Sequence, residues 1–435
     1  MTLTAMPKYD TYKNSGVEWL GDIPDHWHVI RLKNAALINP VSDISKLHLD
    51  DEICFLPMEK VGVDGTVEYD LRRTLRSVKQ GFTSFQNNDV IIAKITPCFE
   101  NGKGAYLNNM PTKFGYGSTE FHVIRAYESF EPAFLYYLSK SHSFMDFGEK
   151  MMTGSAGQKR VPTDFIAEFR FSSPSFIEQT VIANFLDKKT TQIDEAITIK
   201  ERQIALLNER KQILIQQAVT KGFNPCAPLR DSGIEWIGKI PEHWECKKVK
   251  HLFRLAMEQS EKNNNHELLS VYSDIGVKPR KELEERGNKA STTDGYWIVK
   301  KGDIVVNKLL AWMGAIGLSE YDGVTSPAYD ILRPEKRLNG YFYHYLFRSK
   351  FCSTELKRHS RGIMDMRLRL YFDKFGVIEV PYPPKEEQDQ IIEKLNELLS
   401  DVNNGINVIH KQIKKYQEYK ATLINSAVTG KIKMV

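Results

Sequence analysis

The sequence predicts a mixed α/β (α+β) fold, with two similar domains in tandem duplicate. Two long α-helices join these domains and pack as an antiparallel coiled coil, which gives a pseudo-two-fold symmetric arrangement. Three observations support this: a motif that occurs twice, strand-like and helical segments that recur in the same order, and two heptad ladders of apolar residues. The 435 residues, 41% hydrophobic and 26% charged, are ordinary for a globular chain of roughly two to four domains. This composition excludes disordered, collagen-like and small disulfide-linked proteins.

The duplication is clearest in a short motif near the start of each half. Ser15–Trp27 reads SGVEWLGDIPDHW and Ser232–Trp244 reads SGIEWIGKIPEHW, so nine of 13 positions are identical at an offset of 217. Three later pairs of segments match at offsets of 214, 208 and 208: Asp89–Ile95 with Asp303–Leu309, Ser118–Arg125 with Ser326–Arg333, and Phe134–Leu138 with Phe342–Leu346. A period this long indicates a duplicated domain with its helix, because solenoid repeats are much shorter.

Two regions lie between the motif and the helix of each repeat, at residues 28–173 and 245–382. Both contain short runs of β-branched and aromatic residues bounded by turns, and short aromatic helical stretches. The expected strands are Val90–Ile95, Phe121–Ile124, Ile304–Val306 and Tyr329–Leu332, and the expected short helices are Pro132–Leu138 and Gly340–Phe347.

The long helices give the strongest local signal. The first is expected over 174–221, where Ser175 and Glu178 have the spacing of a capping box, and it stops before Gly222. The second is expected over 383–435, with its stop at Gly430. Steps of three and four residues define the seam positions Ile182, Leu186, Ile193, Ile197, Ile204, Leu207, Leu214, Ile391, Leu395, Val402, Ile406, Ile413, Tyr416 and Leu423.

A helix of about 45 residues with one narrow apolar stripe needs a partner, and the other helix is the obvious one. The alternative, in which each helix lies on its own globular domain, is disfavoured because the stripe stays narrow over about six heptads. The predicted segments are therefore a first α/β domain at 1–173, a central helix at 174–221, a second α/β domain at 222–382 and a C-terminal helix at 383–435.

Charge differs between the two duplicated regions. Residues 28–173 hold 17 basic and 17 acidic residues, whereas residues 245–380 hold 24 and 18. Basic and polar residues gather beside glycines in loops, where backbone can approach a phosphate and Lys or Arg can neutralise it. The alternative is a solvated surface with glycine turns. The candidate DNA-binding residues are Lys94, Asn101, Lys103, Ser155, Gln158, Lys159, Arg160, Lys278, Arg280, Lys308, Arg361, Arg367 and Arg369.

No catalytic apparatus can be assembled from the sequence. There is no phosphate-binding G-x-x-x-x-G-K-[ST] loop, no Asn-Pro-Pro-aromatic tetrad and no local nucleophile–base signature. His26-Trp27-His28 could suggest a metal, but the tryptophan between the two histidines favours a packed corner. We therefore assign no catalytic residue and no metal ligand.

The expected compartment follows from two further features. No apolar run is long enough for a transmembrane helix, and the first 14 residues lack the apolar core of a signal peptide. The five cysteines lie far apart without a Cys-x-x-Cys pair. We expect a cytoplasmic protein with reduced thiols.

The duplicated motif and the helix openings carry a family resemblance. The openings read Pro174…Glu178-Gln179-x-x-Ile182 and Pro384…Glu387-Gln388-x-x-Ile391, and the loop Gly154–Arg160 is also similar to a recurring loop of the family. On these residues the sequence resembles the specificity subunits of type I restriction–modification enzymes over nearly its whole length. The second loop, residues 360–367, departs from the Gly-Ser-x-Gly-Gln form of the first.

The resemblance implies that the two α/β domains are target-recognition domains and that each reads one half of a split, asymmetric double-stranded DNA target. It also implies that the helices hold these domains at a set distance and that two modification (methyltransferase) subunits dock on the chain. Those subunits would bind S-adenosylmethionine, and restriction (translocase/nuclease) subunits would use ATP and Mg²⁺, so this chain would hold no cofactor and perform no catalysis. Two other interpretations stay open: a self-contained DNA methyltransferase or nuclease with degenerate motifs, and a coiled-coil adaptor that binds proteins.

Overall fold

The structure is a computed structural model that describes residues 6–155, 157–283, 293–363 and 367–434. Its contacts divide the chain into two compact units. Unit 1 comprises Met1–Lys200 and Lys411–Val435, and unit 2 comprises Glu201–His410. Each unit therefore holds one mixed domain and one half of each long helix. The predicted division into four segments stays a prediction, and the contacts divide the chain differently because each domain packs on the helix halves beside it.

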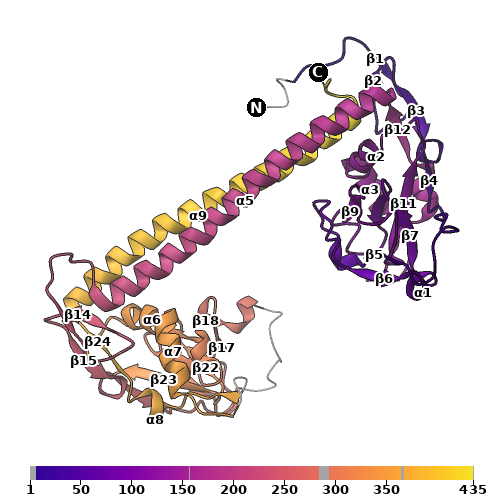
Figure 1. Ribbon diagram of the computed structural model, residues 1–435. Helices are drawn as coiled ribbons and strands as arrows, with labels where there is room; N and C mark the ends of the chain where they lie inside the picture. The colour runs from indigo at the N-terminus through magenta and orange to yellow at the C-terminus, as the bar shows by residue number, and fades with distance from the viewer. Residues whose placement is uncertain (1–5, 156, 284–292, 364–366, 435) are drawn as a thin grey trace. The chain divides into compact units, whose positions relative to one another are not determined.

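Unit 1 begins with a small antiparallel sheet and contains two four-stranded sheets (Figure 1). Its strands and helices are β1 (Tyr12–Asn14), β2 (Asp22–Pro24), β3 (His28–Arg31), β4 (Ala36–Ile38), β5 (Glu52–Leu56), β6 (Arg72–Thr74), α1 (Leu75–Val78), β7 (Thr83–Gln86), β8 (Val90–Ala93), β9 (Gly104–Tyr106), β10 (Phe114–Gly117), β11 (Phe121–Ala126), α2 (Pro132–Ser139), α3 (His142–Lys150), α4 (Thr163–Glu168), β12 (Arg170–Ser173) and the first part of α5 (Phe176–Lys221).

Unit 2 repeats this order with shorter sheets around a sheet of four strands. Its elements after α5 are β13 (Leu229–Asp231), β14 (Lys239–Pro241), β15 (Glu245–Lys248), β16 (Phe253–Ala256), β17 (Leu269–Tyr272), β18 (Gly276–Pro279), β19 (Trp297–Val299), β20 (Ile304–Asn307), β21 (Ile316–Leu318), β22 (Gly323–Thr325), β23 (Tyr329–Pro334), α6 (Gly340–Arg348), α7 (Lys350–His359), α8 (Phe372–Phe375), β24 (Glu379–Tyr382) and the first part of α9 (Lys385–Val428).

The central sheets of the two units have the same topology. The order is β4-β11-β8-β9 in unit 1 and β16-β23-β20-β21 in unit 2, and every pairing within both sheets is antiparallel. The second sheet differs: unit 1 has β6-β5-β10-β7, with β5 and β10 parallel, where unit 2 has the pairs β17-β18 and β19-β22. The predicted fold class is confirmed, and its antiparallel sheets place it on the α+β side.

A buried ion pair occurs at the same place in both central sheets. The Arg125 guanidinium donates to both carboxylate oxygens of Asp89 at 2.8 Å, and Arg333 donates to Asp303 at 3.0 and 2.9 Å. The two aspartate side chains are 1% and 2% exposed. Each pair ties the residue before the central strand to the neighbouring strand, so it fixes the register of the two strands at the end opposite the candidate loops described below.

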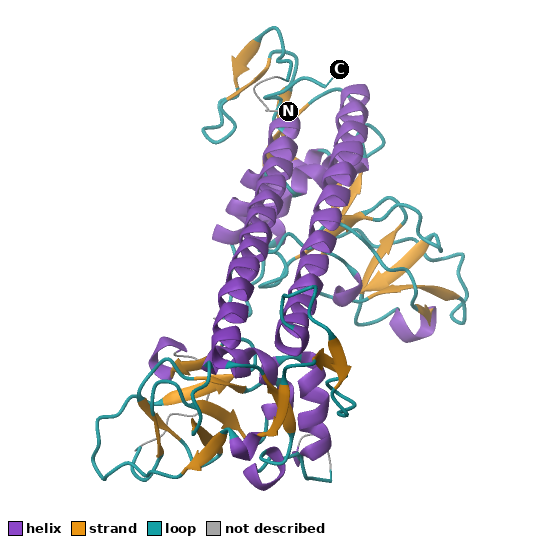
Figure 2. Cartoon of the chain, turned by 90° about the vertical axis from the view of Figure 1, so that its left-hand side faces the viewer, coloured by secondary structure: helices purple, strands orange, loops and turns teal. Residues whose placement is uncertain are grey.

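The long helices α5 and α9 run antiparallel within each unit (Figures 1 and 2). In unit 1, Lys420 from the end of α9 donates to the Asp194 carboxylate of early α5 at 2.6 Å. In unit 2, Lys211 from late α5 donates to Asn403 of early α9 at 3.1 Å. None of the predicted seam side chains is exposed. The buried ones are Ile182, Leu186, Ile193, Ile391, Leu395, Ile413 and Leu423, and the half-buried ones are Ile197, Ile204, Leu207, Leu214, Val402, Ile406 and Tyr416.

The duplicated motif forms a corner against the helix start. Trp27 is fully buried and its indole N–H donates to Glu178 at 3.1 Å, and the imidazole of His26 contacts the same carboxylate. Ser175 accepts from the Glu178 backbone N–H at 3.3 Å, which is one half of the predicted capping box. The Glu178 side chain contacts the corner, and Tyr9 also donates to it at 2.6 Å. Glu178 thus binds the corner to α5.

The end of α9 also packs on the corner of unit 1. Gly430 has a φ of +75°, and a Cβ there would lie 2.5 Å from Pro24 and 3.1 Å from Trp27, so only glycine fits. The Lys431 ammonium donates to the carbonyl of Asp22 at 2.8 Å, and the Lys433 N–H donates to the Pro7 carbonyl at 2.8 Å. The first and last described segments of the chain therefore belong to one compact unit.

Candidate nucleic-acid interface

In unit 1, the lysine that follows β8 lies beside a glycine-containing hairpin. The Val161 N–H donates to the Lys94 carbonyl at 2.8 Å, which attaches the end of the hairpin to the end of the strand. Thr153 and Arg160 close the hairpin, because each backbone N–H donates to the other carbonyl, at 3.0 and 2.8 Å. We call Lys94 with the described residues of 153–160 the loop–lysine site of unit 1.

Unit 2 has the same construction. The Leu370 N–H donates to the Lys308 carbonyl at 2.8 Å, and Arg361 and Arg369 close the hairpin with reciprocal bonds of 2.9 Å. Lys308 with the described residues of 361–369 is the loop–lysine site of unit 2. The equivalence of this loop to the loop of unit 1 was not evident from the sequence, because the second loop is one residue longer and has a different composition.

Glycines confirm the equivalence of the two hairpins. A Cβ on Gly154 would lie 2.8 Å from the Gln158 carbonyl oxygen, and one on Gly362 would lie 2.6 Å from the Arg367 carbonyl oxygen. Both hairpins therefore cross tightly over this glycine, which has no space for a side chain. Gln158 and Arg367 occupy matching positions, and both residue types can make paired hydrogen bonds to base edges.

The polar residues of the unit 1 site are exposed, with one cation already engaged. Ser155, Gln158 and Lys159 are exposed to solvent. Arg160 donates two hydrogen bonds to the Glu120 carboxylate, at 2.9 and 2.7 Å. These bonds hold the pKa of Glu120 below its usual range. Glu120 thus competes with any phosphate for Arg160.

The unit 2 site lacks this competing carboxylate. Lys308 and Lys94 occupy matching places, and the backbone partner of Lys308 is Ala328 where that of Lys94 is Glu120. Arg367 and Arg369 are exposed, and Arg361 is exposed with Asp373 at 3.6 Å. The three arginines make this site more cationic than that of unit 1.

The ammonium of Lys308 already has two partners within unit 2. It donates to the Pro327 carbonyl at 2.7 Å and lies 3.4 Å from the Asp330 carboxylate. Burial raises the pKa of Asp330, although Lys308 opposes this shift. The side chain of Lys308 can therefore contribute a long-range positive charge more readily than a direct phosphate contact.

Other cationic side chains among the predicted DNA-binding residues also interact with groups of the protein itself. The Lys103 ammonium donates to the Met58 carbonyl at 3.0 Å, and Lys278 donates to the Tyr321 hydroxyl at 2.9 Å. Arg280 is half-buried and acts electrostatically on the hydroxyl of Tyr329, which is also half-buried. Asn101 is exposed in the loop that follows Lys94. A role in DNA binding stays a prediction for all of these residues.

Sequence reasoning missed a basic side chain that supports the loops of each unit. Lys140, just after α2, donates to the backbone carbonyls of Val63, Gly102 and Gly104. Arg348, at the end of α6, donates to five carbonyls, those of Tyr272, Ser273, Asp274, Gly314 and Ile316. The signal was present in the sequence, because each residue comes two positions after one of the matched aromatic segments.

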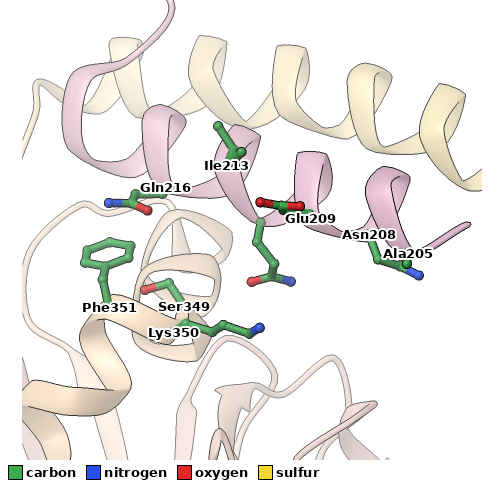
Figure 3. A pocket seen from close by; sticks show the side chains of 9 residues that line it. Ala205, Asn208, Glu209, Ile213, Gln216, Ser349, Lys350 and Phe351 are labelled. Carbon is green, nitrogen blue, oxygen red and sulfur yellow. The ribbon is translucent and has the colours of Figure 1, made fainter. Parts of the chain in front are cut away.

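A cavity of about 570 Å³ in unit 2 lies apart from this site, between α5 and the start of α7 (Figure 3). Ile213 and Gln216 line it from α5, and Lys350 and Phe351 from α7. Its lining holds one cation and one carboxylate, Glu209, and none of the predicted DNA-binding residues. Its charges therefore do not favour a polyanion.

Among the residues that the structure describes, every helix is too short or too polar to span a membrane. No group of three or more histidine, cysteine, aspartate or glutamate side chains within the described ranges could hold a metal ion.

A duplicated α+β domain with a basic hairpin in each copy, attached to paired long helices, defines a class of two-module recognition subunits. The family described as the type I restriction modification DNA specificity domain matches residues 72–209 and 241–415. This match covers more than half of the chain, so the chain belongs to that family.

Relatives agree with this assignment. The chain is 36% identical over 198 residues to the type I restriction enzyme EcoAI specificity subunit of Escherichia coli, a match that covers 44% of this chain and 32% of the relative. The EcoEI specificity subunit of the same organism is 35% identical with the same coverage. The MjaVIII specificity subunit of Methanocaldococcus jannaschii is 25% identical, covering 69% of both chains. The matched part thus spans about one third of the two Escherichia coli relatives.

Solved structures share the fold. One chain, from work on complex assembly and conformational transition of the type I R-M system, has a TM-score of 0.70 at 16% identity, with 93% of this chain and 98% of that chain covered. The HsdS subunit from Thermoanaerobacter tengcongensis has a TM-score of 0.56 at 16% identity, with 94% and 98% covered. At these identities the likeness concerns the fold alone.

Proposed function

We propose that this chain is the DNA sequence-specificity subunit of a type I restriction–modification system, and that each unit binds one half of a two-part, asymmetric target. The observation that carries this proposal is the recurrence of one loop–lysine site in both units of a chain from this family. Because the hairpins share a backbone frame but differ in their side chains, they suit the same task on different sequences.

The exposed residues divide by chemistry into two roles. Lys159, Arg361 and Arg369 would neutralise phosphates, which provides most of the affinity and makes it depend steeply on salt. Gln158 and Arg367 would read base edges, since glutamine pairs well with adenine and arginine with guanine in the major groove. Each such pair would contribute about 1–3 kcal/mol of discrimination.

The chemistry would belong to partner subunits in the cytoplasm. Two modification subunits would bind S-adenosylmethionine and methylate the DNA, and restriction subunits would use ATP and Mg²⁺. This chain would supply sequence-specific binding energy, part of which offsets the few kcal/mol needed to flip the target base out of the duplex. It would hold no cofactor and would not be an enzyme by itself.

Replacing Arg367 with alanine should relax recognition in one half-site only. We expect a loss of about 1–3 kcal/mol at one base position, with the other half unchanged, because the side chain belongs to one unit. The methylome of cells that carry the variant with its partner subunits would show this as one degenerate position in a two-part motif.

Arg254 is a matched control for this substitution. It is exposed on β16 opposite Arg333, whereas the loop–lysine site lies at the other end of β23, beside Tyr329. Arg254→Ala should leave the motif unchanged. Equal weakening of both half-sites by Arg367→Ala would refute the assignment of one unit to one half. Methyl transfer by the purified chain alone would favour a self-contained enzyme instead.

Releasing Arg160 should strengthen DNA binding. Glu120→Gln removes its paired acceptor and one negative charge, so we expect a severalfold higher affinity and a salt dependence steeper by about one phosphate contact. Ala328→Glu should have the opposite effect, because it would place the same carboxylate beside Arg369. Titration of labelled duplex with the reconstituted complex at several salt concentrations measures both. Glu128→Gln, an exposed carboxylate after β11, should change neither.

A further inference from the structure

The loops around the unit 2 site expose an unusual group of apolar side chains. Leu309 is 36% exposed, Leu310 44%, Met313 54% and Ile363 100%. We call these four residues the apolar patch. Single exposed apolar residues are common, but four on neighbouring loops call for a partner.

The apolar patch lies among the cations of the loop–lysine site. Leu309 and Leu310 directly follow Lys308, whose carbonyl binds the end of the hairpin, and Met313 ends the short 3₁₀ helix that follows them. Ile363 is part of the hairpin itself, between the paired residues Arg361 and Arg369. The patch therefore belongs to the surface that is proposed to face DNA.

The matching positions of unit 1 are mostly polar. The equivalent of Ile363 is Ser155, which directly follows Gly154 as Ile363 follows Gly362. Thr96 matches Leu310 at the offset of 214, and its hydroxyl donates a hydrogen bond to the Lys159 carbonyl at 3.4 Å. Asn101, one residue before the turn glycine, matches Met313. The two sites thus share a frame and differ in whether their side chains can form hydrogen bonds.

This difference indicates which bases unit 2 recognises. In the major groove the C5-methyl of thymine is the one apolar group that a base pair presents, and apolar side chains are suited to contact it. We propose that the apolar patch packs against thymine methyl groups in the half-site bound by unit 2, whereas unit 1 reads its half-site mainly through hydrogen bonds. This inference rests on the proposed function and adds the chemical class of bases that one unit reads.

A protein partner is the main competing occupant. The surrounding charges favour DNA, because Arg361, Arg367 and Arg369 are exposed around the patch and suit a polyanion. A subunit that docks in the same way on both repeats would also need the same chemistry in both, and the polar residues of unit 1 do not provide it.

Replacing thymine with deoxyuridine removes this methyl group and leaves all base-pair hydrogen bonds in place. The target is first defined by the methylome, and the Arg367→Ala result assigns one half to unit 2. In a duplex titration with the reconstituted complex, deoxyuridine in the unit 2 half-site should weaken binding by about threefold to tenfold for each methyl contacted. Deoxyuridine in the unit 1 half-site should change binding less than twofold.

Variants of the patch provide the second arm of the experiment. Leu310→Thr, Met313→Asn and Ile363→Ser install the unit 1 residues, and the triple variant should bind thymine and deoxyuridine duplexes equally. A unit 2 half-site without thymine, or one indifferent to deoxyuridine, would overturn the inference while leaving sequence-specific binding intact. Loss of modification-subunit assembly in the variant, with its thymine preference unchanged, would also overturn it in favour of a protein partner. Absence of sequence-specific binding by the unaltered complex would instead refute the proposed function.

Discussion

Replacing Asp303 with alanine should lower the free energy of unfolding of unit 2 by about 3–5 kcal/mol. The substitution removes the two Asp303 oxygens that accept from the largely buried Arg333 guanidinium and leaves it the Glu258 carboxylate alone, and it removes the acceptor of the Lys300 N–H at 2.8 Å. A buried charge that loses its buried partner is among the costliest single changes in a protein, and the more exposed Glu258 compensates for only part of that loss. Urea unfolding, followed by hydrogen exchange of the β20 and β23 amides, would measure the loss and locate it.

Two variants show whether burial causes the effect. Asp322→Ala removes an exposed carboxylate that also accepts a backbone N–H, from Lys301 at 2.8 Å, and should cost less than about 1 kcal/mol. Asp303→Leu combined with Arg333→Leu removes both charges and should recover much of the stability. A loss below about 1 kcal/mol for Asp303→Ala would contradict the central role of this pair. Asp89→Ala should act in unit 1 as Asp303→Ala does in unit 2.

Replacing Arg348 with methionine should lower the free energy of unfolding of unit 2 by about 2–4 kcal/mol and reduce the affinity for the DNA half-site that unit 2 binds. Five backbone carbonyls lose their donor, and hydrogen bonds to charged groups contribute about 1.5–3 kcal/mol each before non-additivity. One of these carbonyls is that of Gly314, which follows the apolar patch residue Met313, so the loop should also lose its position. Urea unfolding and duplex titration measure the two effects.

The duplicated unit supplies the control for this variant. Lysine fills the equivalent place in unit 1, so Arg348→Lys should retain a cation in the carbonyl cluster and recover at least half of the lost stability. Lys140→Arg is the reciprocal change. If Arg348→Met left both stability and half-site affinity unchanged, the carbonyl cluster would have no role in supporting the loop.

The helices and the duplication were predictable because their signals are periodic. Apolar positions at steps of three and four residues occur only when one face is buried, and a motif repeated at nine of 13 positions has no other explanation than duplication. A capping box was predicted from Ser175 and Glu178, and its serine half forms, but the sequence could not show that the glutamate carboxylate would bind the Trp27 corner, which is distant along the chain.

The candidate site was predictable only in part. Glycine and basic residues indicated both hairpins, yet whether a lysine points to solvent or to a carbonyl depends on tertiary neighbours, as Lys103 and Lys278 show. The Asp89–Arg125 pair had a signal, because its members open one matched segment and close the next. Pattern reading alone does not reveal that two such residues meet across strands.

The contact of the Lys433 N–H with the Pro7 carbonyl has a consequence for the chain connectivity that this fold can tolerate. In unit 2 a continuous stretch leads from Gly222, which lies beside Trp244, to the corner at Pro228, so each corner has a helix-ending glycine of positive φ next to its tryptophan. A circular permutant, with its ends fused by a short flexible bridge and a new opening at 223–227, would encode the same two units. In such a permutant the order of the two repeats along the chain would depend only on the position of the new termini.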